Sequence, residues 1–298
     1  MILPWSSSLA DKWDAYCDQH DQAWFWHRSG WMTYCDARHT PTLNLSFAMI
    51  SGEKIVGICP IILDDCSLTY QAGPCPRPIC EDRSVQIEMM SHLKAIFDSY
   101  LVEDYTFRGN GNIINLPSEN ISWKTRIIDL QPLSEIEIVR RWRNVRKSYK
   151  SLINNTRRVY RIEKSINPRD VHILHALHRE QAGYETRPKA SWDLMAAWVH
   201  TGHAYLCLCW NSAGICEGAI YVYSYKGHEY YGHAATNKDN INHALIWEAL
   251  RTSDAQTFEM GWQGYAENRK EQDIEFFRRG FGGTEYPVPA SRVHLKKT

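Results

Sequence analysis

Hydrophobic and polar positions follow the same order in both halves of the chain. In the N-terminal half, two strand-like apolar runs flank the turn Ser51-Gly52-Glu53-Lys54, which predicts a β-hairpin. Further along, Val85, Met89 and Leu93 are apolar at helical spacing. The expected elements are strands at 43–50, 55–63 and 67–71, a helix at 84–100 and a strand at 105–108.

The C-terminal half repeats this order with stronger signals. Its expected elements are strands at 203–210, 217–226 and 229–236, a helix at 240–253, a strand at 257–260 and a last helix at 273–279. Three antiparallel strands, a crossover helix and a parallel strand predict a splayed sheet with a ligand cleft beside the strand ends. Gly280 is expected to end the last helix in a left-handed cap. The repeat predicts a mixed α/β fold with two similar domains, at 1–131 and 132–298.

Three helices are expected between the two repeats. Ser134 and Glu137 form a capping box, which predicts that a helix begins there and continues to Leu152. Asn167-Pro168 and Ser191 begin the other two. The first helix carries a basic face of Arg140, Arg143, Lys147 and Lys150. This face is either a solvated surface or a contact for the phosphates of a tRNA or nucleotide-sugar.

Composition narrows the class of protein. The net charge is zero, so the molecule as a whole does not match a nucleic acid. No apolar run is long enough to span a bilayer and no signal peptide is recognised, which predicts a cytoplasmic protein. The nine cysteines form no CxxC pair, and the helical histidines His172, His175 and His178 are joined by no carboxylate motif, so no metal is expected. The oligomeric state stays open.

Several motifs, in order, resemble the Fem-type proteins, which are tandem GNAT-fold acyl and aminoacyl transferases. The closing Phe277-Arg278-Arg279-Gly280-Phe281-Gly282 resembles the family's Phe-Lys-x-Gly-Phe-Gly. The run Trp142–Lys147 resembles its Arg-rich helix, and Glu259-x-Gly261 resembles the end of its late strand. In the first half, His27-Arg28-Ser29-Gly30-Trp31 and Val56-Gly57-x-x-Pro60 are similar to the entry motif and the first hairpin. The resemblance implies two tandem GNAT-like domains, each a splayed mixed sheet flanked by helices.

The chain departs from the family pattern at two places. Arg278 stands where the family usually has lysine, which replaces a point charge with a planar fork. The loop 237–243 before the crossover helix contains no glycine, whereas acyl-CoA enzymes of this fold usually have a Gly-rich loop there. Helix N-terminal amides still suit an anion. The missing glycines favour aminoacyl-tRNA over acyl-CoA as donor, and both donors stay open.

Candidate site residues follow from these motifs. His233, on a strand expected to line the cleft, and Glu259, at the end of the parallel strand, are the candidate general bases. Arg278 is expected to bind an anionic group or the developing oxyanion. The expected substrate-binding residues are Trp31, Tyr184, Arg187, Tyr221, Tyr223 and Tyr231. The expected donor-binding residues are Asn240, Asn242, Arg143 and Lys147. Core packing of the tyrosines, a structural His233 and a simple helix cap at Arg278-Arg279 are the alternatives.

The sequence thus predicts an N-acyltransferase that forms an amide on an amino group of a sugar-nucleotide or cell-surface precursor, for the cell envelope or a surface polysaccharide. The resemblance implies direct attack of the acceptor on acyl-CoA, a co-substrate, with no tightly bound cofactor. Aminoacyl-tRNA-dependent transfer onto an amino sugar or peptide is the first alternative. A non-catalytic binding module on the same fold is the second.

Overall fold

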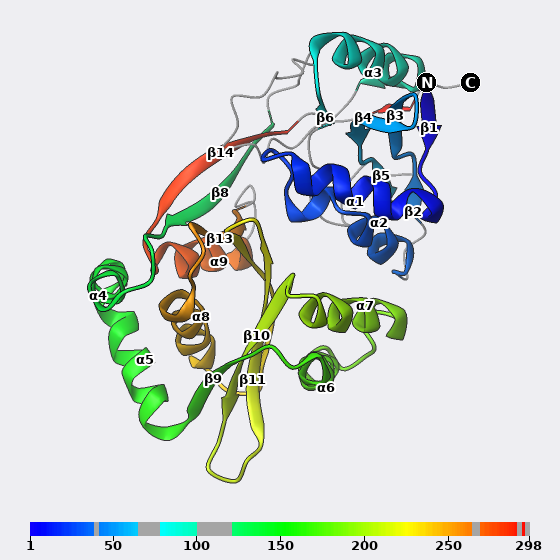
Figure 1. Cartoon of the computed structure of the whole chain (residues 1–298). Coiled ribbons are helices and arrows are strands. Elements are labelled where there is room, and N and C mark those ends of the chain that lie inside the picture. Colours follow the sequence, from blue (N-terminus) through cyan, green and yellow to red (C-terminus); the bar gives the residue numbers. More distant parts are fainter. Residues whose placement is uncertain (39–41, 65–77, 100–120, 264–268, 291–293, 296–298) are drawn as a thin grey trace. The chain divides into compact units, whose positions relative to one another are not determined.

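The computed structural model describes residues 1–38, 42–64, 78–99, 121–263, 269–290 and 294–295. The chain forms two compact units (Figure 1). Unit 1 comprises Met1–Trp123 with Val288–Thr298, and unit 2 comprises Lys124–Pro287. The division falls at Trp123/Lys124 rather than at the expected 131/132, because strand β8 (Ile121–Asp129) pairs with β13 in the sheet of unit 2.

Unit 1 combines short antiparallel strands with three α-helices. Its strands are β1 (Ile2–Pro4), β2 (Thr42–Asn44), β3 (Phe47–Ser51), β4 (Lys54–Cys59), β5 (Ile62–Asp64), β6 (Ile79–Cys80), β7 (Phe97–Ser99) and β15 (His294–Leu295). Its helices are α1 (Ala10–Gln19), α2 (Ser29–Asp36) and α3 (Arg83–Ile96), with 3-10 turns at Ser7–Leu9 and Phe25–His27. The sheets have the orders β1-β3-β4-β6, β2-β5 and β15-β7.

The predicted hairpin of this unit is confirmed as β3–β4, and the predicted helix as α3. The single strand expected at 55–63 is two strands, β4 and β5, in different sheets. Pro60 lies between them, and its missing N–H cannot continue a ladder. The strands predicted at 67–71 and 105–108 lie outside the described residues.

Unit 2 is built on a seven-stranded sheet of order β14-β8-β13-β12-β11-β10-β9. Its further strands are β9 (Arg161–Ser165), β10 (Ala204–Trp210), β11 (Cys216–Tyr225), β12 (His228–Thr236), β13 (Thr257–Gln263) and β14 (Thr284–Ala290). Its helices are α4 (Glu135–Asn144), α5 (Lys147–Val159), α6 (Val171–Ala182), α7 (Lys189–His200), α8 (Ile241–Thr252) and α9 (Arg269–Arg279), with a 3-10 turn at Pro168–Asp170. The predicted order β10-β11-β12-α8-β13 is confirmed, and β12 pairs with β13 in parallel.

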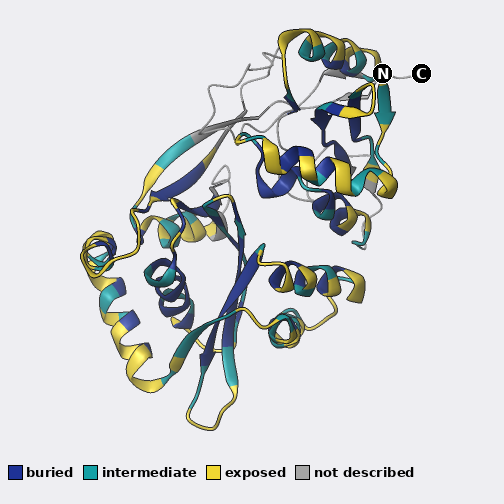
Figure 2. Cartoon of the chain, in the orientation of Figure 1, coloured by how far each residue is buried: buried dark blue, intermediate teal, exposed yellow. Residues whose placement is uncertain are grey.

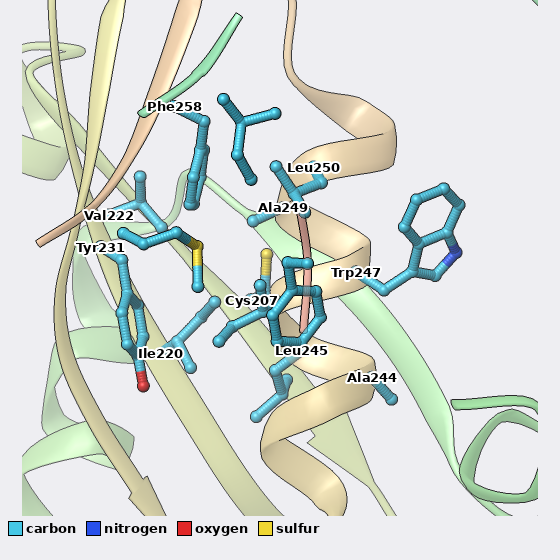
Figure 3. Close-up of a cluster of buried hydrophobic side chains, with 14 of the residues drawn as sticks. Cys207, Ile220, Val222, Tyr231, Ala244, Leu245, Trp247, Ala249, Leu250 and Phe258 are labelled. Carbon is cyan, nitrogen blue, oxygen red and sulfur yellow. The ribbon is translucent and has the colours of Figure 1, made fainter. Parts of the chain in front are cut away.

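Helices cover both faces of this sheet. Helices α5 and α8 lie over one face, and α6 and α7 lie over the other (Figure 1). On the first face, Ile220, Val222 and Tyr231 of the sheet pack against Leu245 and Ala249 of α8 (Figure 3). The strands are largely buried, whereas the outward sides of α4 and α5 are exposed (Figure 2). Burial of the apolar face of α8 therefore fixes the position of this helix, which follows β12, against the sheet.

The single helix expected from Ser134 to Leu152 is two helices, because the chain breaks at Val145 and Arg146. Both residues are extended, with ψ of 134° and 140°. The N–H of Arg146 donates to the carbonyl of Gly280 at 2.7 Å, a bond outside the helix. The pattern also failed to predict strand β9, whose five residues are at most half-buried.

Candidate active site

The parallel pairing of β12 with β13 ends shortly after it begins. The last pair is Tyr230↔Glu259, although β12 continues to Thr236 and β13 to Gln263. Strand β13 also changes register against β8 just after Glu259. Gly261, in this irregular stretch, has a φ of +81°, a conformation that favours glycine. The parting of the parallel strands expected from the sequence is therefore present. It lies at a topological switch point of the sheet, where ligands commonly bind.

Arg278, in the last turn of α9, lies against this stretch of β13. A Cβ added to Gly261 would be 3.4 Å from Arg278 Nη2 and 3.0 Å from Tyr230 Oη. The guanidinium and the phenol therefore both approach the backbone where the strands part. Arg279 has different surroundings, because it is exposed and pairs with Glu275 one turn earlier on α9.

Gly280 is needed for space rather than for a left-handed conformation. In the described turn after α9, the left-handed φ values belong to Gly282 (+89°) and Gly283 (+82°), so the left-handed cap expected at Gly280 is wrong. A Cβ on Gly280 would lie 2.0 Å from the ring of Tyr149 on α5. The closing motif therefore places the end of α9 against α5, which holds Arg278 in position.

Helix α8 begins next to the parting strands. Asn240 precedes it with a φ of +67°, a left-handed conformation that asparagine adopts more readily than most residues. Asn242 Nδ2 donates to Tyr231 Oη at 3.0 Å, and this bond connects the helix start to β12. The first N–H groups of a helix lack intrahelical acceptors and suit an anion. Two of the predicted donor-binding residues, Asn240 and Asn242, and the predicted Tyr231 thus lie together.

The other two predicted donor contacts lie on the neighbouring helices. Arg143 near the end of α4 and Lys147 at the start of α5 are both exposed. Tyr149 on the same turn as Lys147 packs on His243 of α8, with ring centroids 4.4 Å apart. The first turn of α5 is therefore near the first turn of α8.

A second polar network occupies the face of the sheet that α6 and α7 cover. Arg187 Nη2 is 3.2 Å from His233 Nδ1, and Arg187 Nη1 is 3.5 Å from His178 Nε2. The other ring nitrogens bond to hydroxyls, His233 Nε2 to Tyr223 at 2.9 Å and His178 Nδ1 to Thr186 at 3.0 Å. Three predicted residues, His233, Arg187 and Tyr223, are thus brought together.

The donor chemistry of this network fixes the protonation of both histidines. A guanidinium only donates, so His233 Nδ1 and His178 Nε2 must accept from Arg187. The proton of each ring is then on the other nitrogen, and His233 Nε2–H donates to Tyr223. Burial lowers the pKa of His178, and the charge of Arg187 lowers it further. Arg187 therefore holds both rings in the neutral form.

The loop that carries Arg187 is fastened to α6 and α7. Glu185 Oε1 is 2.5 Å from His175 Nε2 and 3.3 Å from Trp192 Nε1. The Arg187 guanidinium also lies over the Trp192 ring, 5.1 Å from its centroid. Tyr184 on the same loop is 68% exposed. The loop thus presents an aromatic side chain to solvent beside the His233 network.

Two predicted substrate contacts lie in cores. Tyr221 is fully buried, and its hydroxyl donates to the carbonyl of Met195 on α7 at 2.9 Å. Trp31 belongs to unit 1, where it is buried between Trp26 and Tyr34. These surroundings favour the packing alternative for both residues.

Glu259, the second candidate base, is fully buried in a third network. Its Oε1 accepts from Thr125 Oγ1 at 2.5 Å, and its Oε2 is 3.0 Å from His228 Nε2. His228 Nδ1 in turn bonds to Thr257. Because Glu259 is fully buried and both its carboxylate oxygens are engaged with β8 and β12, the geometry favours a structural role for it.

Tyr230 and His178 are among the residues of these networks that the sequence did not single out as site residues. Tyr230 approaches Tyr223, whereas Tyr231 is in the α8 core. His178 entered only through the helical spacing of three histidines. Its position five residues before Gly183, near the end of α6, was the available signal, since helix ends lie near loops that carry function.

The three histidines of α6 have separate surroundings. His175 is bonded to Glu185, His178 to Thr186 and Arg187, and His172 is exposed. Within the described part of the chain, no group of three or more His, Cys, Asp or Glu side chains is arranged to hold a metal ion. No helix among the described residues is long and apolar enough to cross a membrane.

Solved structures match this chain, whereas comparisons of its sequence found no match. No protein-family model matches the chain, and no curated protein matches it. The structure of FemX matches with a TM-score of 0.64 at 11% identity, covering 99% of this chain and 97% of FemX. L-PGS from Bacillus licheniformis matches with a TM-score of 0.56 at 11% identity, over 97% of this chain and 92% of that one. A conserved protein of unknown function from Bacteroides thetaiotaomicron matches with a TM-score of 0.51 at 11% identity, over 99% of both chains.

The chain has the FemX fold. The similarity extends over both units, and this confirms the fold class and the Fem-like resemblance predicted from the motifs at the level of fold. Because identity to FemX is 11%, the comparison shows the fold and neither the site residues nor the molecules they bind.

Proposed function

We propose that the chain is an N-acyltransferase, which joins an acyl group from acyl-CoA to an amino group of a sugar-nucleotide or cell-surface precursor. The observation that carries this proposal is the parting of β12 and β13 after Tyr230↔Glu259, with Arg278 and the start of α8 at the same place. The place where two parallel strands separate beside a helix N-terminus suits a ligand that carries both an amide chain and phosphates. The FemX-like fold supports transfer chemistry of this kind.

In this proposal the start of α8 and Asn242 hold the phosphate end of the donor. Asn240 adopts the left-handed conformation that a glycine would otherwise supply. The glycine-free loop is therefore compatible with a bound anion. Arg278 lies where the strands part and donates to the developing oxyanion, a contact that strengthens in the transition state. The reaction forms the N–C bond of the amide and breaks the C–S bond of the thioester.

The proton of the acceptor amine goes to His233 and then to the departing thiol. Tyr223 and Arg187 hold the imidazole neutral, with the Nδ1 lone pair facing Arg187. Arg187 must therefore shift when His233 takes the proton, and the exposed Tyr184 loop that carries it is a suitable contact for the acceptor. A neutral imidazole is a suitable general base for this step.

Transfer from aminoacyl-tRNA is the second candidate. The exposed cations Arg143 and Lys147 near the start of α8 favour it, because phosphate contacts supply most of the affinity for RNA. The tRNA would approach from the α4–α5 side.

Thermal unfolding of the purified protein tests both donors. A donor present at about 100 times its dissociation constant should stabilise the protein by about 2.7 kcal/mol. We expect acetyl-CoA to raise the midpoint and Asn242→Ala to reduce the rise, with adenosine diphosphate as the control for nucleotide binding alone. A rise with aminoacyl-tRNA only would select the second candidate. No rise with either donor, and no transfer to a panel of amino sugars, would favour a non-catalytic binding module.

A further inference from the structure

Helix α4 is apolar on two opposite sides. Its inner side places Ile138 and Trp142 against the core of unit 2. Its outer side carries Leu133, just before the helix, with Ile136 and Val139, which are 44%, 83% and 49% exposed. Ile136 and Val139 are three positions apart in the helix, so they lie on one side of adjacent turns. Single exposed apolar residues are ordinary, but two on one side of a helix, with a third just before it, indicate a surface that something covers.

Cations lie at the C-terminal end of α4, where it joins α5. Arg143 and Lys147 are exposed at the α4–α5 junction. Lys150 Nζ donates to the carbonyl of Arg143 at 3.2 Å and lies over the Trp142 ring, so its charge is at the same junction. An apolar ridge next to a basic cluster is the pattern of a helix that lies in the interface of an anionic membrane.

We infer that the outer side of α4, with the α4–α5 junction, binds the surface of an anionic lipid bilayer. The cations attract the headgroups, and Leu133, Ile136 and Val139 enter the boundary between headgroups and acyl chains. The ridge decides against a nucleic acid, because isoleucine and valine side chains add nothing to phosphate contacts. The inference is independent of transfer from acyl-CoA, and it competes with the aminoacyl-tRNA candidate for Arg143 and Lys147.

Co-sedimentation with vesicles tests the surface. We expect the protein to bind vesicles of phosphatidylglycerol and phosphatidylcholine, and not vesicles of phosphatidylcholine alone. Binding should weaken with salt, since the cations are exposed. Arg143→Gln and Lys147→Gln should each weaken it about five-fold. Ile136→Ser should weaken it about ten-fold.

A matched control separates this surface from general stickiness. Ile166→Ser changes another isoleucine, 74% exposed, just after β9, and should bind vesicles like the unchanged protein. Ile136→Ser should leave the midpoint of thermal unfolding unchanged, because the exposed Ile136 side chain makes little packing contact. Equal binding to both kinds of vesicle, or none, would overturn the inference. A monomer–dimer equilibrium that Ile136→Ser abolishes would also overturn it. The same holds if Arg143→Gln weakens binding of tRNA while Ile136→Ser has no effect on binding to vesicles.

Discussion

Strand β12 carries two histidines, His228 and His233, in opposite electrostatic settings. His228 bonds to the fully buried carboxylate of Glu259, which favours the charged form of the ring. His233 bonds to the guanidinium of Arg187 on a partly exposed loop, which favours the neutral form. The buried pair of Glu259 and His228 is costly to break, because loss of one partner leaves an uncompensated buried charge. A neutral ring held by a loop is free to take a proton when the loop shifts, so the two networks separate a structural role from a chemical one.

Replacing the two histidines one at a time gives the largest contrast. His233→Gln should lower kcat by about 10²–10⁴-fold, because a general base supplies an effect of that size, and should change the unfolding free energy by less than about 1 kcal/mol. His228→Gln should lower stability and leave kcat nearly unchanged. Both variants are measured by steady-state kinetics and urea unfolding. Equal loss of kcat in the two would remove the distinction.

Glu259→Ala should lower the free energy of unfolding by about 3–4 kcal/mol. The change leaves Thr125 and His228 without their buried acceptor and opens a cavity. Glu259→Gln keeps the volume and one acceptor, so its loss should be smaller. Urea denaturation measures both. A stable Glu259→Ala protein without turnover would instead make Glu259 the base.

Arg187→Gln should raise the pKa of His178, because the neighbouring positive charge of Arg187 lowers it. Nitrogen NMR of histidine-labelled protein reads the tautomer and the titration directly. The acidic limb of the pH–kcat profile should move the same way. Arg179→Gln, on the exposed side of α6, is the matched control and should leave the His233 signals in place. Unmoved signals in Arg187→Gln would contradict the tautomer assignment.

The smallest expected effect is on stability at mildly acidic pH. Burial lowers the pKa of His243, and burial with the Arg187 charge lowers that of His178. The unfolded chain then binds more protons than the folded one below the ordinary value of about 6.5. Stability should therefore fall as the pH drops from about 6.5 toward the lower folded values, and it should fall less in Arg187→Gln. Thermal midpoints across this range measure it, and a rise on acidification would contradict it.

The sequence predicts the order of elements in unit 2 because each strand and helix buries its own apolar side. The positions of Asn240 and Asn242 at the start of α8 and of Arg278 at the end of α9 follow from the sequence, because they flank clear element ends. The sequence does not predict the break at Val145-Arg146, which depends on the carbonyl of Gly280 far along the chain. Nor does it predict that Tyr221 and Glu259 are saturated by partners, because side-chain hydrogen bonds across the sheet leave no periodic signal. The Arg187 network is not predicted for the same reason, because it joins side chains from three separate elements.

The account depends most on the site being where β12 and β13 part, beside Arg278, and one pair of variants tests this directly. Arg278→Ala should lower kcat/KM by the equivalent of about 2–4 kcal/mol, as loss of a charge-assisted donor to the transition state does. Arg278→Lys should recover part of the loss, because it keeps the charge but not the planar fork. Arg279→Ala should stay near the unchanged protein, since Arg279 is exposed and pairs only locally with Glu275. Loss of activity in Arg279→Ala with full activity in Arg278→Ala would contradict the placement of the site.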